Sequence, residues 1–90
     1  MVMEDNRQTY LIIYDNDFIY ETFSDSVKSA LVSFCSYTSG ETSSTLLEKA
    51  LVGFNEQDIK NMIELYNKIS NGFYTIVSIY QVEKKLYNNI

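Results

Sequence analysis

Hydrophobic and polar positions alternate in two runs within residues 9–23, TYLIIYDNDFIYETF, and a short polar segment separates the runs. Both runs are rich in β-branched and aromatic residues, whose stiff side chains favour strands. Asp15, Asn16 and Asp17 lie between them, and Asn and Asp tolerate the backbone of a turn. The pattern therefore predicts a β-hairpin closed by a three-residue loop.

This loop length sets Tyr14 opposite Phe18 and divides the hairpin side chains between two faces. We expect one face to pack against helices; it consists of Leu11, Ile13, Ile19 and Phe23. The other face is rich in tyrosine and consists of Tyr10, Ile12, Tyr14, Phe18 and Tyr20. A one-residue change of register would exchange the two faces. The alternative is therefore that helices or the C-terminal tail cover the tyrosine-rich face.

Three stretches with apolar residues at helical spacing follow the hairpin. The first is expected at about residues 25–37, with Ser24 as its N-cap, and residues 38–44 then form a loop. A capping box formed by Thr45 and Glu48 opens a second helix that runs to about Val52. A third helix begins after Asn55, and Asn71-Gly72 ends it.

Residues 73–82, FYTIVSIYQV, form the longest strand-like run and are expected to pair with the hairpin. The tail, residues 83–90, continues this strand or frays. The predicted fold is a single α+β domain over residues 1–90, with residues 1–8 frayed. It has a three-stranded antiparallel-type sheet, the element order ββαααβ and helices on one face. The expected core is Leu11, Ile13, Ile19, Phe23, Val27, Leu31, Phe34, Leu47, Leu51, Ile59, Ile63, Tyr66, Val77 and Ile79.

The formal net charge is −5, and residues 1–58 hold ten acidic side chains against three basic ones. An acidic body disfavours direct binding to nucleic acid, which needs Lys and Arg to displace counterions. It suits a basic surface on another protein, such as the channel of a nucleic-acid-binding protein. Solubility alone would also account for this charge.

No catalytic or metal-binding constellation is recognisable. The chain lacks histidine, its one cysteine cannot build a zinc site, and its three glycines are too scattered for a phosphate loop. Asp15, Asp17 and Glu21 lack the glycine and the spacing of a calcium loop, which favours an ordinary turn. Cys35 has no basic neighbour in the predicted helix, so we expect a buried, inert thiol. We therefore expect a protein that is not an enzyme and has no cofactor.

The lone cysteine permits no internal disulfide, which favours a reducing compartment. Residues 1–8 carry Glu4 and Asp5 and lack the apolar core of a signal peptide. No apolar run reaches the roughly 18 residues that a membrane span needs. We expect a cytoplasmic protein without a membrane partner.

Tyrosine is the feature with positive functional content, because eight tyrosines supply most of the aromatic residues. Tyrosine gives contact area at little cost in entropy, so a tyrosine-rich sheet face predicts a protein interface. Tyr74 and Tyr80 are expected to share a face of the last strand. The candidate partner-binding residues are Tyr10, Tyr14, Asp15, Asp17, Tyr20, Glu21, Tyr74 and Tyr80. The alternative is a structural or self-assembling protein with this face as a homodimer interface.

A strand pair followed at once by a capped helix, YLIIYDNDFIYETFSDSVKSALVSF, resembles short proteins carried by phages and mobile elements, including anti-CRISPR proteins. The resemblance covers roughly residues 9–37 and lies in size, acidity, composition and ββα order. It implies a non-catalytic inhibitor that occludes a nucleic-acid-binding surface of its partner. It carries no diagnostic motif, so it assigns no residue roles.

Overall fold

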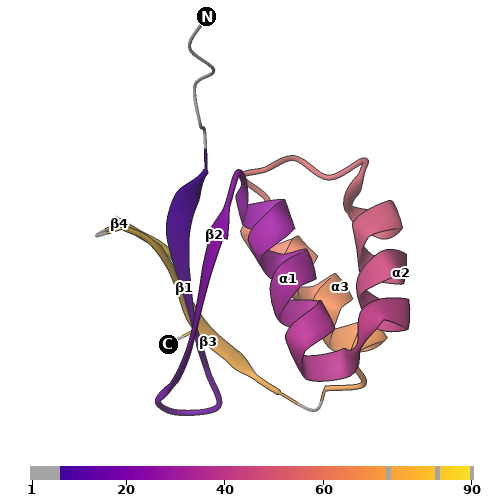
Figure 1. Cartoon of the computed structure of the whole chain (residues 1–90), viewed down its shortest axis with the longest axis horizontal. Helices are drawn as coiled ribbons and strands as arrows, with labels where there is room; N and C mark the ends of the chain where they lie inside the picture. Colours follow the sequence, from indigo (N-terminus) through magenta and orange to yellow (C-terminus); the bar gives the residue numbers. More distant parts are fainter. Residues whose placement is uncertain (1–6, 73, 83, 90) are drawn as a thin grey trace, which may run out of the picture.

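The computed structural model describes residues 7–72, 74–82 and 84–89. It is an α+β domain in which a four-stranded antiparallel sheet carries three helices on one side (Figure 1). The elements are β1 (Gln8–Tyr14), β2 (Phe18–Ser24), α1 (Val27–Ser39), α2 (Glu41–Leu51), α3 (Ile59–Ile69), β3 (Ile76–Gln81) and β4 (Lys84–Asn88).

The hairpin has the predicted register, with Tyr14 paired to Phe18 across a loop of residues 15–17. Asp15 enters this loop with a φ of 59°. Its backbone N donates to the Thr75 carbonyl at 2.7 Å, and its Oδ1 accepts from the Thr75 N at 3.0 Å. Aspartate tolerates the left-handed conformation. The hairpin tip is thereby bonded to the segment that precedes β3.

The predicted three-stranded sheet and ββαααβ order are wrong by one strand. The chain turns back after β3 and adds β4, giving the strand order β2-β1-β3-β4. Val82 in this turn has a φ of 56°, which a β-branched residue rarely adopts. The sequence QVEK contains no glycine or asparagine to mark a hairpin turn, so the tail could not be recognised as a separate strand.

The helices begin and end elsewhere than predicted in the first half of the chain. Ser26, rather than Ser24, caps α1, and its Oγ accepts from the Ser29 N at 3.1 Å. The loop predicted for residues 38–44 is reduced to Gly40, which ends α1 and precedes α2. Its φ of 93° and ψ of 173° turn the chain within one residue. The hydroxyl-rich segment after it is helical, so tertiary packing overrides its low helix propensity.

The predicted stop of the third helix is confirmed. Asn71 and Gly72 both have positive φ values, and the Gly72 N donates to the Asn67 carbonyl at 2.9 Å. Asn55 does not cap α3 directly, because its Oδ1 accepts from the Gln57 N in the turn before the helix. Asp58 occupies the N-cap position and accepts instead from the Asn61 side chain.

The core contains most of the predicted helix residues but the opposite face of the hairpin. Ile12 is fully buried, and Tyr10 and Tyr14 are 5% and 8% exposed. Ile19 and Phe23, predicted as core, are 62% and 55% exposed. Leu11, Ile13 and Val77 are half-buried rather than enclosed. The tyrosine-rich face, and not its counterpart, packs against the helices.

Aromatic rings explain why this face is the inner one. Phe34 of α1 is fully buried, and its ring centroid lies 5.0 Å from Tyr14, 5.5 Å from Tyr20 and 5.4 Å from Tyr66. The rings are tilted against one another, an arrangement that aromatic pairs prefer. Large flat side chains from β1, β2 and α3 thus fill the space around one phenylalanine.

Candidate protein-binding surface

Two of the predicted contact residues lie inside the core. Burial raises the pKa of Tyr10, and nearby Glu56 and Asp25 raise it further. A side-chain hydrogen bond with Tyr37 and burial raise the pKa of Tyr14. Neither ring presents a face to solvent in the folded protein. The expectation that Tyr10 and Tyr14 contact a partner from an exposed, tyrosine-rich sheet face is therefore wrong.

Tyr20 and Tyr74 are half-buried and also serve the core. The Tyr20 hydroxyl is 2.6 Å from the Ser33 hydroxyl of α1, and its ring stacks on Tyr37 with centroids 4.8 Å apart. The ring of Tyr74 meets the ring of Tyr14 edge-on, with the ring centroids 5.6 Å apart. Both residues pack chiefly against the protein itself.

Tyr80 lies on the other side of the sheet from Tyr74, which corrects the expectation that they share a face. Ile13 pairs with Ser78 and Tyr14 with Ile76, so Val77 has no partner in β1. This irregularity adds a residue to β3 and breaks the alternation of faces. Phe73, the first residue of the predicted strand, lies outside the described residues.

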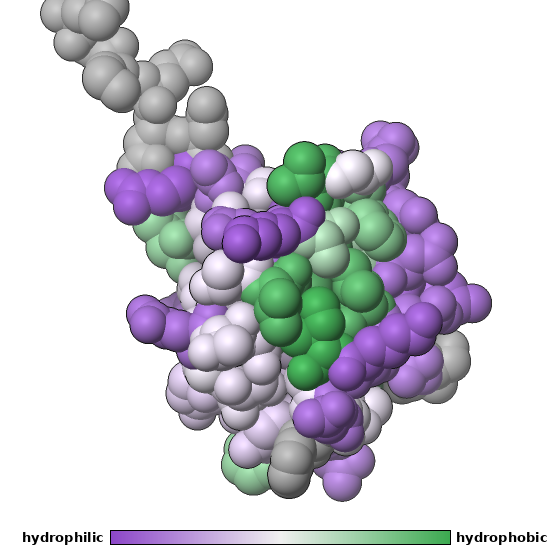
Figure 2. All heavy atoms as spheres, turned by 90° about the vertical axis from the view of Figure 1, so that its right-hand side faces the viewer, coloured by the Kyte–Doolittle hydropathy of each residue, from purple (hydrophilic) through white to green (hydrophobic). Residues whose placement is uncertain are grey.

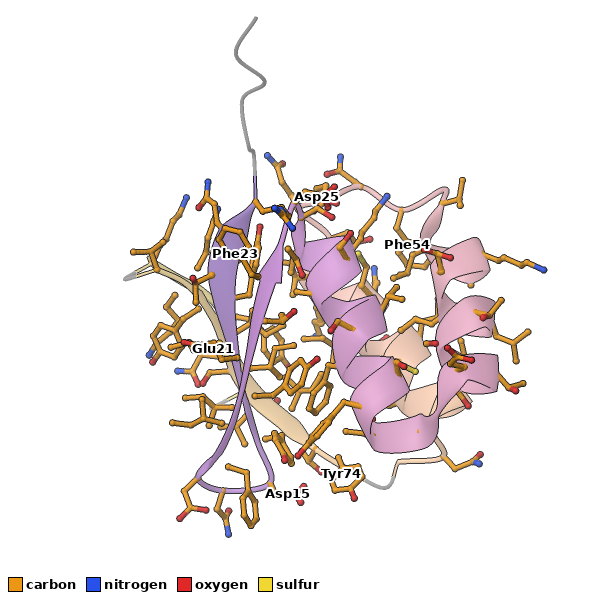
Figure 3. All side chains as sticks on the ribbon, in the orientation of Figure 1. Asp15, Glu21, Phe23, Asp25, Phe54 and Tyr74 are labelled. Atoms are coloured by element: carbon orange, nitrogen blue, oxygen red, sulfur yellow. The ribbon has the colours of Figure 1, made fainter. Side chains whose placement is uncertain are left out.

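The three predicted carboxylates do not form one cluster beside the tyrosines. Asp15 is half-buried and bonded to Thr75, so its main role is to hold the hairpin tip. Asp17 is exposed at the tip. Glu21 pairs with Leu11 and lies on the face turned away from the helices (Figure 3).

That face is the strongest candidate for a contact surface, and we call it the outer sheet face. Its apolar members are Leu11, Ile13, Ile19, Phe23 and Tyr80. Among the described elements, all three helices lie on the opposite side of the sheet (Figure 1).

Charged side chains accompany the outer sheet face. The Arg7 guanidinium lies 5.0 Å from the centre of the Phe23 ring, and the Lys85 ammonium lies 5.5 Å from that of Tyr80. These are cation–π distances. Glu21 lies between Ile19 and Phe23 along β2. The outer sheet face is therefore apolar, with single charges placed across it.

The sequence holds one signal, the position of Glu21, for which face of the hairpin is exposed, and the prediction from periodicity did not use it. Glu21 shares its period-two set with Ile19 and Phe23, the residues predicted to pack under helices. An ionised carboxylate in the middle of a buried face is costly unless it is paired. Glu21 alone thus favoured solvent exposure for the set that contains it.

A second apolar surface lies on the α2 side of the molecule (Figure 2). Leu46 is 56% exposed and Val52 is 79% exposed, and Phe54 and Leu65 are half-buried. An open hollow of about 500 Å³ beside α3 is lined by Phe54, Leu65 and polar residues that include Asp58 and Lys68.

In the part of the chain that the structure describes, no group of three His, Cys, Asp or Glu side chains is placed to hold a metal ion. Cys35 is buried, as expected, and burial raises the pKa of its thiol. Within residues 7–72, 74–82 and 84–89, no helix is both long and apolar enough to cross a membrane.

Comparison of the chain with models of protein families, with curated proteins and with solved structures gives no match.

Proposed function

We propose that this protein is a non-catalytic binding module that recognises another protein through its outer sheet face. The observation that carries the proposal is the exposure of Ile19 and Phe23, 62% and 55%, on one face of one strand. Exposed apolar side chains in a contiguous group are typical of interaction sites. Half-buried Leu11, Ile13 and Tyr80 extend the same surface across three strands.

An inhibitor that occludes a basic or nucleic-acid-binding surface is the finer form of this proposal. The hairpin region from residue 15 to residue 27 carries four carboxylates and no Lys or Arg. Asp17, Glu21 and Asp25 are all exposed. Carboxylates can stand in for phosphates in front of a basic channel, and an anti-CRISPR-like role would use them in this way.

A homodimer built on a tyrosine-rich face is not supported, because Tyr10 and Tyr14 are core residues. Self-association through the outer sheet face would be a different arrangement, because Tyr80 is the one tyrosine among the apolar residues that define that face. Sedimentation of the protein over a concentration series distinguishes a monomer from such a dimer.

The proposal is tested by affinity capture from the native host with matched surface variants. Ile19→Ser and Phe23→Ser alter the outer sheet face, and Val52→Ser alters another exposed apolar side chain, on the helix side. A partner retained by the parent and by Val52→Ser, but lost from both hairpin variants, is the expected result. Captured proteins that bind all four forms alike would contradict a role for this face.

Electrostatics can be tested once that partner is in hand. Asp17→Asn with Glu21→Gln should slow association and flatten its dependence on salt, because charges steer encounter over a screening length of about 8 Å at physiological ionic strength. Phe23→Ala should instead speed dissociation. Association that is insensitive to salt would argue that the carboxylates are only solvated surface.

A further inference from the structure

The two edges of the sheet are built differently. β4 carries Lys84 and Lys85, and its pairing with β3 contains a register shift. Lysines and bulges on an edge strand discourage the addition of further strands. β2 has seven residues, no Lys, Pro or Gly, and an unbroken register against β1. By these criteria β4 is a protected edge and β2 is an open one.

The hydrogen-bond pattern identifies the backbone groups on the β2 edge. The Thr9 carbonyl accepts from the Val82 N, so odd-numbered residues of β1 direct their backbone groups toward β3. Even-numbered residues of β1 then face β2, where Ile12 pairs with Tyr20. The odd-numbered residues of β2, which are Ile19, Glu21 and Phe23, therefore direct their N–H and C=O groups away from the sheet.

The same three residues place their side chains on the outer sheet face, and all three are exposed. An added strand would meet two apolar side chains with a carboxylate between them. Asp17 precedes β2, Asp25 follows it, and both are exposed. Arg7 lies over the Phe23 ring at one end of the edge, and the rest of the edge is acidic.

We propose that the β2 edge binds an extended segment of a partner protein as a fifth strand of the sheet, and that this segment alternates apolar residues with a lysine or arginine opposite Glu21. Strand addition draws affinity from main-chain hydrogen bonds and specificity from alternate side chains. Opposite charges facing each other across strands stabilise the pair, and like charges destabilise it.

A second copy of the chain is a poorer occupant. Antiparallel pairing of β2 with itself that matches Ile19 to Phe23 sets Glu21 opposite Glu21. Shifting that register by two residues sets the carboxylate opposite Ile19 or Phe23 instead. A basic strand from another protein avoids both conflicts. This inference rests on the proposed function, which it narrows from a protein-binding face to one mode of binding.

The experiment uses the whole chain and a synthetic peptide, acetyl-Thr-Val-Thr-Lys-Thr-Val-Thr-amide, with a control peptide that has Glu in place of Lys. Amide hydrogen exchange is followed by NMR. We expect the Lys peptide to protect the amides of Ile19, Glu21 and Phe23, which point to the free edge. The amides of Tyr20 and Thr22 already bond to β1 and should not change. The Lys peptide should bind roughly two- to tenfold more tightly than the Glu peptide.

Three variants at position 21 test the backbone N–H and the side-chain charge independently. Glu21→Pro removes an outward N–H, which an edge strand tolerates, and should abolish protection of the neighbouring edge amides. Glu21→Gln keeps the N–H and should bind both peptides alike. Glu21→Lys should reverse the preference toward the Glu peptide, which tests the pairing even if the proline variant fails to fold.

Each contrary result has a distinct meaning. Binding without protection of the odd-numbered amides would overturn strand addition but leave face-to-face binding intact. Failure of both peptides to bind would overturn the basic-strand partner, whereas the capture experiment with Ile19→Ser and Phe23→Ser tests the proposed function independently. Edge amides that are protected in the peptide-free protein and lose protection on dilution would assign the edge to a second copy and overturn the proposal.

Discussion

The Tyr66 hydroxyl of α3 lies 2.9 Å from the Thr38 hydroxyl of α1, inside the helical layer. Thr38 also donates to the Phe34 carbonyl at 3.0 Å, so its hydroxyl keeps a partner if Tyr66 is altered. This contact bonds two helices that are far apart in sequence. It also satisfies the polar end of a fully buried tyrosine.

Tyr66→Phe should lower the free energy of unfolding by about 0.5–1.5 kcal/mol, the net value of one hydrogen bond. Thr38→Val and the double variant complete a cycle that isolates the coupling between the two hydroxyls. Urea unfolding measures all four proteins. Strictly additive losses would show that the two hydroxyls do not interact in solution.

The protein should lose stability in alkali. Burial raises the pKa of Tyr66 and of Tyr10 in the folded state, while unfolded tyrosines ionise near about pH 10. A raised folded-state pKa gives stability that is full below the unfolded value and is lost as pH rises through the folded value. The urea midpoint should therefore fall above about pH 10.

Tyr66→Phe is the control for this alkaline effect, because it removes one of the responsible groups. Its midpoint should fall less between pH 8 and pH 11 than the midpoint of the parent. Absorbance near 295 nm reports tyrosine ionisation in the same samples. Equal falls in the two proteins would assign the alkaline sensitivity to other groups.

Two isoleucines of the hairpin test which face is the inner one. Ile12 is fully buried and Ile19 is 62% exposed. Ile12→Ala should cost about 2–5 kcal/mol because it leaves a cavity, whereas Ile19→Ala should stay within about 1 kcal/mol. Equal losses in denaturant unfolding would contradict the assignment of faces.

Gly40 and Gly53 form a matched pair for backbone strain. A Cβ at either position would meet no atom within 4 Å, so space is not the issue. Only Gly40 has a positive φ, 93°, in a region that is essentially restricted to glycine. Gly40→Ala should cost about 1–3 kcal/mol, whereas Gly53→Ala should be neutral or slightly stabilising. Similar thermal midpoints for the two variants would refute this account of the α1–α2 turn.

The hairpin tip distinguishes a structural carboxylate from a surface one. Asp15→Ala removes the acceptor of the Thr75 N–H and a residue suited to positive φ, so it should cost about 1–2 kcal/mol. Asp15→Asn retains both features and should cost less. Asp17→Ala should be near neutral because Asp17 is exposed. A tip that tolerates all three changes equally would leave the Asp15 bonds without a role in stability.

The sequence by itself determined the features that depend on neighbouring residues alone: the hairpin and its register, the apolar faces of helices, and the end of the third helix. Period-two alternation and the Asp15-Asn16-Asp17 break fixed the hairpin and its register, because side chains of a strand alternate and Asp accepts a turn. Helical spacing identified Leu31, Phe34 and Tyr66 as core residues. Asn71-Gly72 ended the third helix because both residues adopt positive φ.

Tertiary structure decided which face of the hairpin is buried. Both faces are apolar, and periodicity separates two sets of side chains without saying which set meets the helices. The choice depends on the rings of Phe34 and Tyr66, which arrive from distant helices and pack against the tyrosines. The fourth strand and the extra residue in β3 likewise depend on pairing between segments. Neither Val82 nor Val77 is a residue type that predicts a turn or a bulge from the local sequence. Glu21 favours exposure of its own set of hairpin side chains, but the pairing with β3 had to be known before Tyr80 could be added to the candidate contact surface.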